Sequence, residues 1–541
     1  MSKRTVLKLG TRRSLLAWAQ SGQVAAAIEK ANPGLKVERV GIDTRGDKIL
    51  DIPLQKVEGK EFFVAEIDDA LRSGAVDLTV HSLKDLSLER PTEFVLAAMP
   101  ERANSRDVAI FGPRVLEKLK RGEVLKIGTS SPRRLENLPS FLGKALPRFG
   151  SATSPKLQFV EIRGNVNTRL GRLHEADTSD RHLDGVILAF AGLIRLWADA
   201  AARAEMTKLF QGVRWMVLPL RENPSAPGQG ALAVECRADD ELVREALAKL
   251  DHPATRSAVA TERGLLAAWG GGCHQRFGAS SVEASSLGAL LYVRGVRPDG
   301  VAVDELQWKA PAAPGRALRA WDGSLSRAGA GVAVGAGVEA SASAGAGGAQ
   351  AGDSPSVAAS APAPSLASGA PVFVAHWRAL APVWEAPLAG ARVWCSGTAS
   401  WYRLAERGVW VEGCAEGLGF DEALPQLAEP VLGLPGLERW TVLTHHEALG
   451  EWQGRVEQAV GTYSAPGEAA EYAPQAVAEL ESAEAAWWSS GSQFTALAAK
   501  ARSVREHACG PGRTARVLRA AGVEPRIFPS VEEWRQWLKS V

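Results

Sequence analysis

The sequence has few cysteines, almost no net charge and no long apolar run, and each shortage excludes a class of protein. Its five cysteines, at positions 236, 273, 395, 414 and 509, are too few for a disulfide framework and form no C-x-x-C pair typical of structural zinc. No apolar run is long enough to span a bilayer, and the N-terminus lacks a signal-peptide core. We therefore expect a cytoplasmic protein with reduced thiols, no metal and no membrane contact.

The net charge of +2 gives no overall field that would attract nucleic acid, so no nucleic-acid partner is expected. An apolar content of 46% and a charged content of 23% are ordinary for a soluble globular protein. The length of 541 residues predicts several domains. Positive charge must therefore be interpreted locally, at the places where it gathers.

Residues 5–237 alternate short apolar runs with helical stretches such as 15–31 and 64–72. This alternation predicts open, mostly parallel α/β sheets, in which ligands bind beyond the carboxyl ends of the strands. The strand candidates are 5–11, 38–44, 77–83, 94–99, 107–112, 124–131, 157–164 and 184–192.

Five of these strands are followed by a basic residue, and we expect the resulting cations to gather at one rim. An isolated arginine is usually solvated, but recurrence at five strand ends favours a binding site. Arginine forks match carboxylates or phosphates, and small hydroxyls and helix N-termini add anion contacts. A ligand with several negative groups is therefore predicted. The cations are Arg12, Lys84, Arg133, Arg134, Arg163, Arg169 and Arg195.

One carboxylate, Asp85, lies among these cations beside Lys84. It is either a salt-bridge partner or a group that transfers protons and stabilises a developing cation, and the residues alone leave both interpretations open. The loop 54–63 resembles a basic flap or a plain surface loop. In the turn 224–230, Gln229 can hydrogen-bond a ligand or a hinge.

Beyond residue 240, two helical stretches and turn-linked alternating strands predict a small α+β domain. Its first part ends in Gly270, Gly271 and Gly272, directly before Cys273. Most cysteines in soluble chains are small core residues. Three glycines, however, remove steric cover and favour an exposed loop that displays the thiol.

Together these motifs resemble hydroxymethylbilane synthase, also called porphobilinogen deaminase, across roughly residues 5–325. The resemblance implies two doubly wound lobes arranged like a type II periplasmic binding protein, with the first lobe spanning 1–100 and resumed at 213–238. The second lobe would span 101–212 and a cofactor-carrying α+β domain 239–326. The matching segments are GTRRSLLAWAQ (10–20), TRGD (44–47), HSLKD (81–85), GTSSPRR (128–134), RGNVNTRL (163–170), AGLIRL (191–196), PGQGALAVE (227–235) and GGC (271–273).

The resemblance also implies a transferase that joins four porphobilinogen molecules head to tail with loss of ammonia and releases linear hydroxymethylbilane for porphyrin and heme biosynthesis. Its dipyrromethane cofactor would be attached through Cys273, and Asp85 would be the catalytic carboxylate. The cofactor would be bound by Ser82, Lys84, Thr129, Ser130, Ser131, Arg133 and Arg134. The substrate's acetate and propionate groups would be bound by Arg12, Ser14, Gln20, Arg163, Arg169 and Arg195.

The sequence departs from the family's pattern at six positions, none of which removes a charged catalytic group. We expect activity to be retained. The departures are Leu15, Glu61, Ser87, Pro132, Asn167 and Pro227.

Residues 327–370 are rich in Ala, Gly, Ser and Pro and predict a flexible linker. Residues 371–541 are globular again, and their last third resembles uroporphyrinogen-III synthase in the segments 510–518 and 522–525. That resemblance implies a second enzyme acting on hydroxymethylbilane, although the region is short for a two-lobed protein. Tyr463 lies at roughly the sequence position where that family has a tyrosine before its second lobe. His445 and His446 are expected in a loop without metal.

Two alternatives remain open on the sequence. The chain could be a non-catalytic two-lobed protein that binds a carboxylated ligand, although such a binder needs neither a displayed thiol nor an acid among arginines. The C-terminal region could be a structural or partner-binding α/β domain. We expect a monomer that acts on a small molecule.

Overall fold

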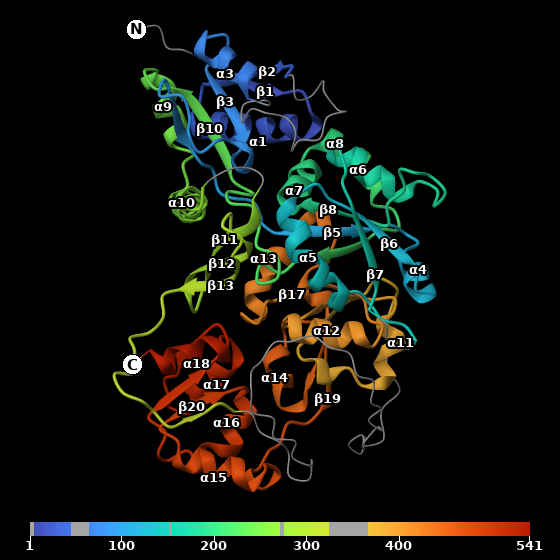
Figure 1. The fold of residues 1–541 in the computed structure, drawn as a ribbon, viewed down its shortest axis with the longest axis vertical. Helices are drawn as coiled ribbons and strands as arrows, with labels where there is room; N and C mark the ends of the chain where they lie inside the picture. The colour runs from blue at the N-terminus through green and yellow to red at the C-terminus, as the bar shows by residue number, and fades with distance from the viewer. Residues whose placement is uncertain (1–4, 45–63, 151–153, 271–274, 324–365, 541) are drawn as a thin grey trace.

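The structure is a computed structural model that describes residues 5–44, 64–150, 154–270, 275–323 and 366–540. Cys273, the 54–63 loop, residues 45–47 of the TRGD motif and most of the expected linker lie outside these ranges. Within them, no helix is both long and apolar enough to cross a bilayer. The described residues form five sheets. In Figure 1 most of the described residues before 250 lie in the upper part, and most of those after 366 lie in the lower part.

The first lobe is built on a five-stranded sheet in the order β2-β1-β3-β10-β4. Strands β1, β2 and β3 are parallel, whereas β10 runs antiparallel to β3 and β4. Helix α1 (Leu15–Ala31) begins where Ser14 accepts a hydrogen bond from Ala17, and it packs Val24 and Ile28 on the sheet. The other elements are β1 (Val6–Arg12), β2 (Lys36–Ile42), α3 (Ala65–Arg72), β3 (Leu78–Ser82), β4 (Phe94–Ala98), β10 (Leu232–Arg237) and α9 (Glu241–Ala248).

The second lobe repeats this arrangement in the order β7-β6-β8-β5-β9, with β5 antiparallel to β8 and β9. Both sheets are thus more mixed than the expected, mostly parallel ones. In each lobe the strand that arrives from the other lobe, β10 or β5, enters in the opposite direction. The elements are β5 (Asp107–Phe111), α4 (Val115–Arg121), β6 (Val124–Gly128), α5 (Pro132–Ala145), β7 (Lys156–Val160), α6 (Val166–Gly171), β8 (Gly185–Ala189), α7 (Phe190–Ala198), α8 (Ala200–Leu209) and β9 (Arg214–Val217).

Two segments, which we call the first crossover (99–106) and the second crossover (218–231), connect the lobes. They are bonded to each other, because the Ala103 N–H donates to the Gly230 carbonyl (3.2 Å) and Arg102 Nε donates to the Gln229 carbonyl (2.7 Å). Beside them lie helix α10 (Pro253–Ala268) and an antiparallel sheet, as expected for the residues after 240 (Figure 1). That sheet consists of β11 (Arg276–Ala284), β12 (Gly288–Val296) and β13 (Ala302–Trp308).

The C-terminal region contains two parallel sheets, ordered β17-β16-β15-β18-β19 and β14-β20-β21-β22. The region that is short for a two-lobed protein thus contains two sheets. One strand of the last sheet, β14 (Ala320–Trp321), precedes the linker in the sequence and pairs with β20. The strands are β15 (Pro371–Val374), β16 (Arg392–Cys395), β17 (Val411–Cys414), β18 (Thr441–His445), β19 (Gln458–Tyr463), β20 (Ala485–Trp488), β21 (Glu506–Cys509) and β22 (Arg526–Ile527).

The C-terminal region, β14 included, is called the C-terminal unit below, and it packs directly on the second lobe. One apolar cluster includes Phe111 and Phe141 of that lobe together with Trp401 and Trp410. The Trp401 indole N–H donates a hydrogen bond to the Ala145 carbonyl (3.1 Å) across this contact. The helices of the unit are α11 (Glu385–Leu388), α12 (Thr398–Glu406), α13 (Leu424–Leu427), α14 (Leu449–Trp452), α15 (Pro474–Ser482), α16 (Gly491–Leu497), α17 (Arg513–Ala520) and α18 (Val531–Lys539).

Candidate active site

A cavity of about 220 Å³ lies between the first and second lobes. Arg12, Ser14 and Lys84 line it from the first lobe, and Arg134 and Arg169 line it from the second. The structure thus brings four of the predicted cations together. They come from two sheets whose strand ends face each other, however, and not from the single rim that the sequence suggested.

Asp107, the first residue of β5, holds the double arginine in place. Its carboxylate accepts from Arg133 Nη2 (2.7 Å) and from Arg134 Nη2 and Nε (2.7 and 3.0 Å). The residue is fully buried, which by itself would raise its pKa, but the two guanidinium groups hold the pKa well below its usual range. The sequence does not predict this role for Asp107, because an aspartate at the start of an apolar strand resembles a solvated strand end.

Arg133 also fixes the second crossover, since its Nη1 donates to the Pro224 carbonyl (2.7 Å) and to Asn223 Oδ1 (3.1 Å). Burial lowers the pKa of this guanidinium. Its Nε is buried and has no hydrogen-bond partner among the described residues. A buried donor of this kind calls for an acceptor, which an anionic ligand can provide.

Lys84 and Asp85 lie on the short 3₁₀ turn Leu83–Asp85 that directly follows β3. Lys84 Nζ donates to Gln229 Oε1 (3.2 Å), and Gln229 Nε2 donates in turn to Asp107 Oδ1 (2.8 Å). Burial lowers the pKa of Lys84, while the charge of Asp85 opposes this shift. Asp85 itself is exposed. The two neighbours therefore differ, because the lysine is bound to the crossover and the carboxylate faces solvent.

Arg195 is buried, and Arg169 is half-buried in the wall of the cavity. Burial, followed by the charges of Arg134, Arg172 and Arg163, lowers the pKa of Arg169 to about 10, and Arg169 Nε donates to the Gly164 carbonyl (2.8 Å). Burial lowers the pKa of Arg195 to about 10, and its Nη2 donates to Gly230 on the second crossover (2.5 Å). Arg169 therefore lines the cavity, whereas Arg195 braces the crossover behind it.

Several predicted hydroxyl and amide groups are engaged within the protein. Gln20 Nε2 donates to Ser82 Oγ (3.0 Å), and Thr129 Oγ1 accepts from the Ser131 N–H (3.3 Å). The Ser130 hydroxyl donates to the carbonyl of Ile162 and accepts from its N–H (3.1 Å). Of the predicted hydroxyl groups, only Ser14 is among the residues that line the cavity.

Three of the departures from the family pattern are accommodated by local structure. Pro132 is the first residue of α5, where a proline costs no hydrogen bond. Asn167 donates to Glu205 Oε1 (2.9 Å), and the carbonyl of Ser87 accepts from Arg263 Nη2 (2.8 Å). These substitutions leave the cations of the cavity unchanged.

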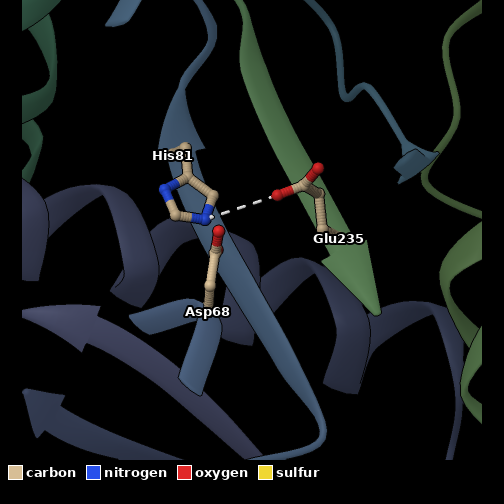
Figure 2. A group of neighbouring side chains, drawn as sticks. All are labelled: Asp68, His81 and Glu235. Atoms are coloured by element: carbon tan, nitrogen blue, oxygen red, sulfur yellow. Dashed lines mark ion pairs between the residues drawn. The ribbon is translucent and has the colours of Figure 1, made fainter. Parts of the chain in front are cut away.

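Figure 2 shows a second group of ionisable residues, Asp68, His81 and Glu235, directed toward one another. Their spacing would suit a metal ion, but Arg90 already bonds both carboxylates at 2.7–3.0 Å. Burial lowers the pKa of His81 to about 4, so the imidazole is neutral. The group is an ion network that supports β3. A similar group with spacing that would suit a metal includes Asp177 and Asp184, and Lys118 forms ion pairs with both carboxylates (3.1 and 2.7 Å).

The C-terminal unit has its own cluster of ionisable groups at the carboxyl ends of parallel strands. His376 follows β15, His445 ends β18 and Tyr463 ends β19, with the Tyr463 ring centroid 5.7 Å from His445 and 6.4 Å from His376. Burial lowers the pKa of His376 to about 4 and raises that of Tyr463. Arg513, the first residue of helix α17, which follows β21 of the other sheet, donates to the Glu447 carbonyl (3.0 Å), so the cluster lies where the two parts of the unit meet.

Comparison with known proteins identifies close relatives of the first half of the chain. The family model described as "Porphobilinogen deaminase, dipyromethane cofactor binding domain" matches residues 7–245. Porphobilinogen deaminase of Acidothermus cellulolyticus is 42% identical over 283 residues, which are 51% of this chain and 76% of that protein. Porphobilinogen deaminase 1 of Streptomyces coelicolor is 44% identical over 274 residues, or 50% and 77% of the two chains.

Among solved structures, the BenM effector binding domain with its effector benzoate is 14% identical, covers 48% of this chain and 93% of its own, and has a TM-score of 0.24. YhfZ from Shigella flexneri is 15% identical, covers 48% and 92%, and has a TM-score of 0.23.

Proposed function

The chain belongs to the porphobilinogen deaminase family, and we propose on that basis that it joins four porphobilinogen molecules into linear hydroxymethylbilane with release of ammonia. The observation that carries this proposal is the cavity in which Arg12, Lys84, Arg134 and Arg169 converge from facing lobes. Each pyrrole of substrate and product bears an acetate and a propionate. A growing chain therefore needs many cations at one place.

The family's dipyrromethane cofactor fits the residues present. The cavity offers several guanidinium groups, and Arg133 retains an unpaired buried Nε, so carboxylates would satisfy donors that the described protein groups do not. We propose that Lys84, Arg133, Arg134 and Arg169 hold the cofactor's carboxylates and that Cys273, outside the described residues, carries its covalent attachment. When bound, the cofactor supplies the pyrrole carbon to which substrates are joined.

The protein's own groups have separate tasks in this proposal. Arg12 and Ser14 at the start of α1 bind the carboxylates of the incoming substrate, and Arg163 contributes positive charge beside Arg169. Asp85, on the solvent side of the Lys84 turn, stabilises positive charge on the substrate as ammonia leaves and accepts the proton lost afterwards. Arg195 acts indirectly by bracing the second crossover.

The first experiment is the intact mass of the purified full chain, followed by a peptide map around Cys273. An added mass of two linked pyrroles on that peptide is expected. Cys273→Ser should lack this mass, whereas Cys236→Ser, which changes a buried cysteine of β10, should keep it. A bare Cys273 thiol that stays unchanged after incubation with porphobilinogen would contradict the proposal and favour a non-catalytic binder.

We also propose the clamp-like arrangement of two lobes that the resemblance implies, together with the monomer and the cytoplasmic location expected from the sequence. The two crossovers support the clamp. The four described cysteines, which are buried and unpaired, support a reducing compartment. The domain limits proposed are those expected from the sequence, except that Ala320–Trp321 belong with the C-terminal unit.

A second candidate function is uroporphyrinogen-III synthesis by the C-terminal unit, favoured by the cluster of Tyr463, His376 and His445 between its two sheets. Tyr463 would assist loss of the hydroxyl group from hydroxymethylbilane. The test uses the full chain with porphobilinogen and separates the uroporphyrin isomers of the oxidised product. Wild type should give isomer III and Tyr463→Phe more isomer I. Isomer I alone from wild type would reject this activity and leave the first proposal intact.

A further inference from the structure

Glu416, in the turn that follows β17 of the C-terminal unit, contacts both crossovers between the catalytic lobes. Its Oε1 accepts from Arg106 Nε (2.9 Å) and Nη2 (2.5 Å) on the first crossover. Its Oε2 accepts from the backbone N–H groups of Leu220 (2.9 Å) and Arg221 (3.3 Å) on the second. One carboxylate therefore connects two segments that are more than a hundred residues apart in sequence.

The contact is buried, and Glu416 adopts an unfavourable backbone conformation where it is made. The Glu416 side chain is 2% exposed and that of Arg106 is 13% exposed, so solvent screens their ion pair little. Glu416 has a φ of 53°, and among the described residues it is the only non-glycine with positive φ. Such backbone is unfavourable for a residue with a Cβ and persists where surrounding structure imposes it. Here the Ala415 N–H donates to the carbonyl of Cys395, the last residue of β16 (2.9 Å), and the Gly417 N–H donates to the carbonyl of Ser396 (2.8 Å), which directs the carboxylate at the crossovers.

The first crossover leads directly into the cation cluster. Arg106 precedes Asp107, which anchors Arg133 and Arg134. Gln229 donates to the Ser105 carbonyl (2.7 Å) and accepts from Lys84. A displacement of the first crossover would therefore move the supports of three cations of the proposed site.

The same kind of contact occurs once more, from the α+β domain. Glu262 of α10 accepts from Arg102 on the first crossover (2.7 Å) and from the Gly228 N–H on the second (2.7 Å). Two lobes joined by two connections change their relative angle through backbone rotation in those connections. A buried carboxylate bonded to both connections opposes that rotation.

We propose that Glu416 is a positioning residue through which the C-terminal unit restrains the two crossovers and so limits opening of the cavity between the lobes. The consequence for catalysis rests on the proposed polymerisation of porphobilinogen. The C-terminal unit would then affect catalysis in the first half through its contact with the crossovers. No reaction intermediate has to pass between the two halves for this effect.

The test compares Glu416→Ala and Glu416→Gln in the full chain with Glu422→Gln as a matched control. Glu422 also links the C-terminal unit to the first half, through Ser285 (2.8 Å), but neither of these residues lies on a crossover. Hydrogen exchange is followed in peptides covering 99–106 and 218–231, and kcat and KM for porphobilinogen are measured separately.

For Glu416→Ala we expect faster exchange in both crossovers and a rise in KM of about five- to fiftyfold, with a smaller change in kcat. Glu416→Gln keeps an acceptor for the Leu220 and Arg221 N–H groups, so its exchange rates and its KM should lie between those of Glu416→Ala and wild type. Glu422→Gln should have the exchange rates and the KM of wild type. If Glu416→Ala fails to fold, Glu416→Gln decides the question.

Unchanged exchange in both crossovers together with an unchanged KM, in folded Glu416 variants, would overturn the proposal. Hydrogen exchange needs no turnover, so its outcome is independent of the proposed activity. Faster exchange in a chain that forms no hydroxymethylbilane would support the restraint and reject only the activity.

Discussion

Asp85 and Asp107 both lie beside the clustered cations, but their surroundings determine which of them can exchange a proton with a ligand. Asp107 is fully buried, and its oxygens accept hydrogen bonds from Arg133, Arg134 and Gln229. Its charge is used to hold those groups. Asp85 is exposed at the end of a short turn, where substrate can reach it. Of the two, only Asp85 can exchange a proton with a ligand without breaking a buried ion network.

Replacing Asp85 with Asn should lower kcat by about 10²- to 10⁴-fold, because the amide neither accepts a proton nor stabilises a cation. Thermal stability and the cofactor mass on Cys273 should stay unchanged, since Asp85 is exposed. Glu89→Gln, an exposed change a few residues further on, is the control for turnover assays. Normal turnover in Asp85→Asn would remove Asp85 from the mechanism.

His81 should make stability depend on pH. Its pKa is about 4 in the folded protein and near 6.5 when unfolded, so the unfolded chain binds more protons between these values. The free energy of unfolding should fall as pH drops from 6.5 to 4, by ~3 kcal/mol from this residue. His81→Asn removes that part of the slope. Its stability deficit relative to wild type should therefore be smaller at pH 4.5 than at pH 8.

Urea unfolding of both proteins at a series of pH values measures this difference. His174→Asn, which changes an exposed histidine, provides the control. A deficit that stays constant across the range would show that His81 is not held neutral in the folded state.

The sequence was informative about cations and uninformative about the acids that hold them. Arg12, Lys84, Arg134 and Arg169 were predicted from their positions after strands, and all four line the cavity. Asp107 and Glu416 could not be found in this way. Their importance comes from partners distant in sequence, such as Arg106 for Glu416, and no local pattern indicates such pairings.

At the scale of elements, the two crossovers are packed too closely for a side chain at Gly230. That glycine has a φ of +87°, and an added Cβ would lie 2.4 Å from the Ala103 carbonyl oxygen. Gly74 also has positive φ, +75°, but no heavy atom lies within 4 Å of its added Cβ. The pair separates the cost of backbone conformation from the cost of close approach.

Gly74→Ala should destabilise the protein by about 1–2 kcal/mol through its backbone conformation alone. Gly230→Ala should cost roughly 1–3 kcal/mol more, because the crossovers must move apart. It should also weaken substrate binding, since Arg195 bonds the Gly230 carbonyl. Chemical denaturation and KM measurements check both effects, and equal stability losses in the two variants would contradict the packing argument.

The order of strands and helices was predictable from periodicity, but strand direction was not. Buried parallel and antiparallel strands have the same apolar composition, so nothing local distinguished β5 and β10 from their neighbours. The two-residue strand β14 is too short to give a periodic signal.

At the scale of the whole molecule, the C-terminal unit is a packed part of the protein and shares an apolar cluster with the second lobe. The Trp401 ring lies edge-on to Phe141 with centroids 5.4 Å apart, and Trp410 is arranged similarly against Phe111 (5.3 Å). Because these tryptophans are buried at the junction, we expect the two halves to unfold together.

Trp401→Ala should lower the free energy of unfolding by about 3–5 kcal/mol. It should also split a single calorimetric transition into two, because the space left by the indole lies at the junction between the halves. Trp488→Ala, which empties an equally buried site within the last sheet, should destabilise the C-terminal unit without altering the contact with the second lobe. If both variants unfold with the same number of transitions, the halves are not coupled through Trp401.

Strand β14 also determines where this protein can be divided into two chains. Ala320–Trp321 stay at the edge of the last sheet, where Trp321 meets Trp488 and Arg316 pairs with Glu484 (2.8 Å). A break anywhere between residues 324 and 365 would therefore yield two fragments that recognise each other through strand pairing. Two genes divided at that point should complement when expressed together, whereas a gene that begins at residue 371 would encode a sheet without its edge strand.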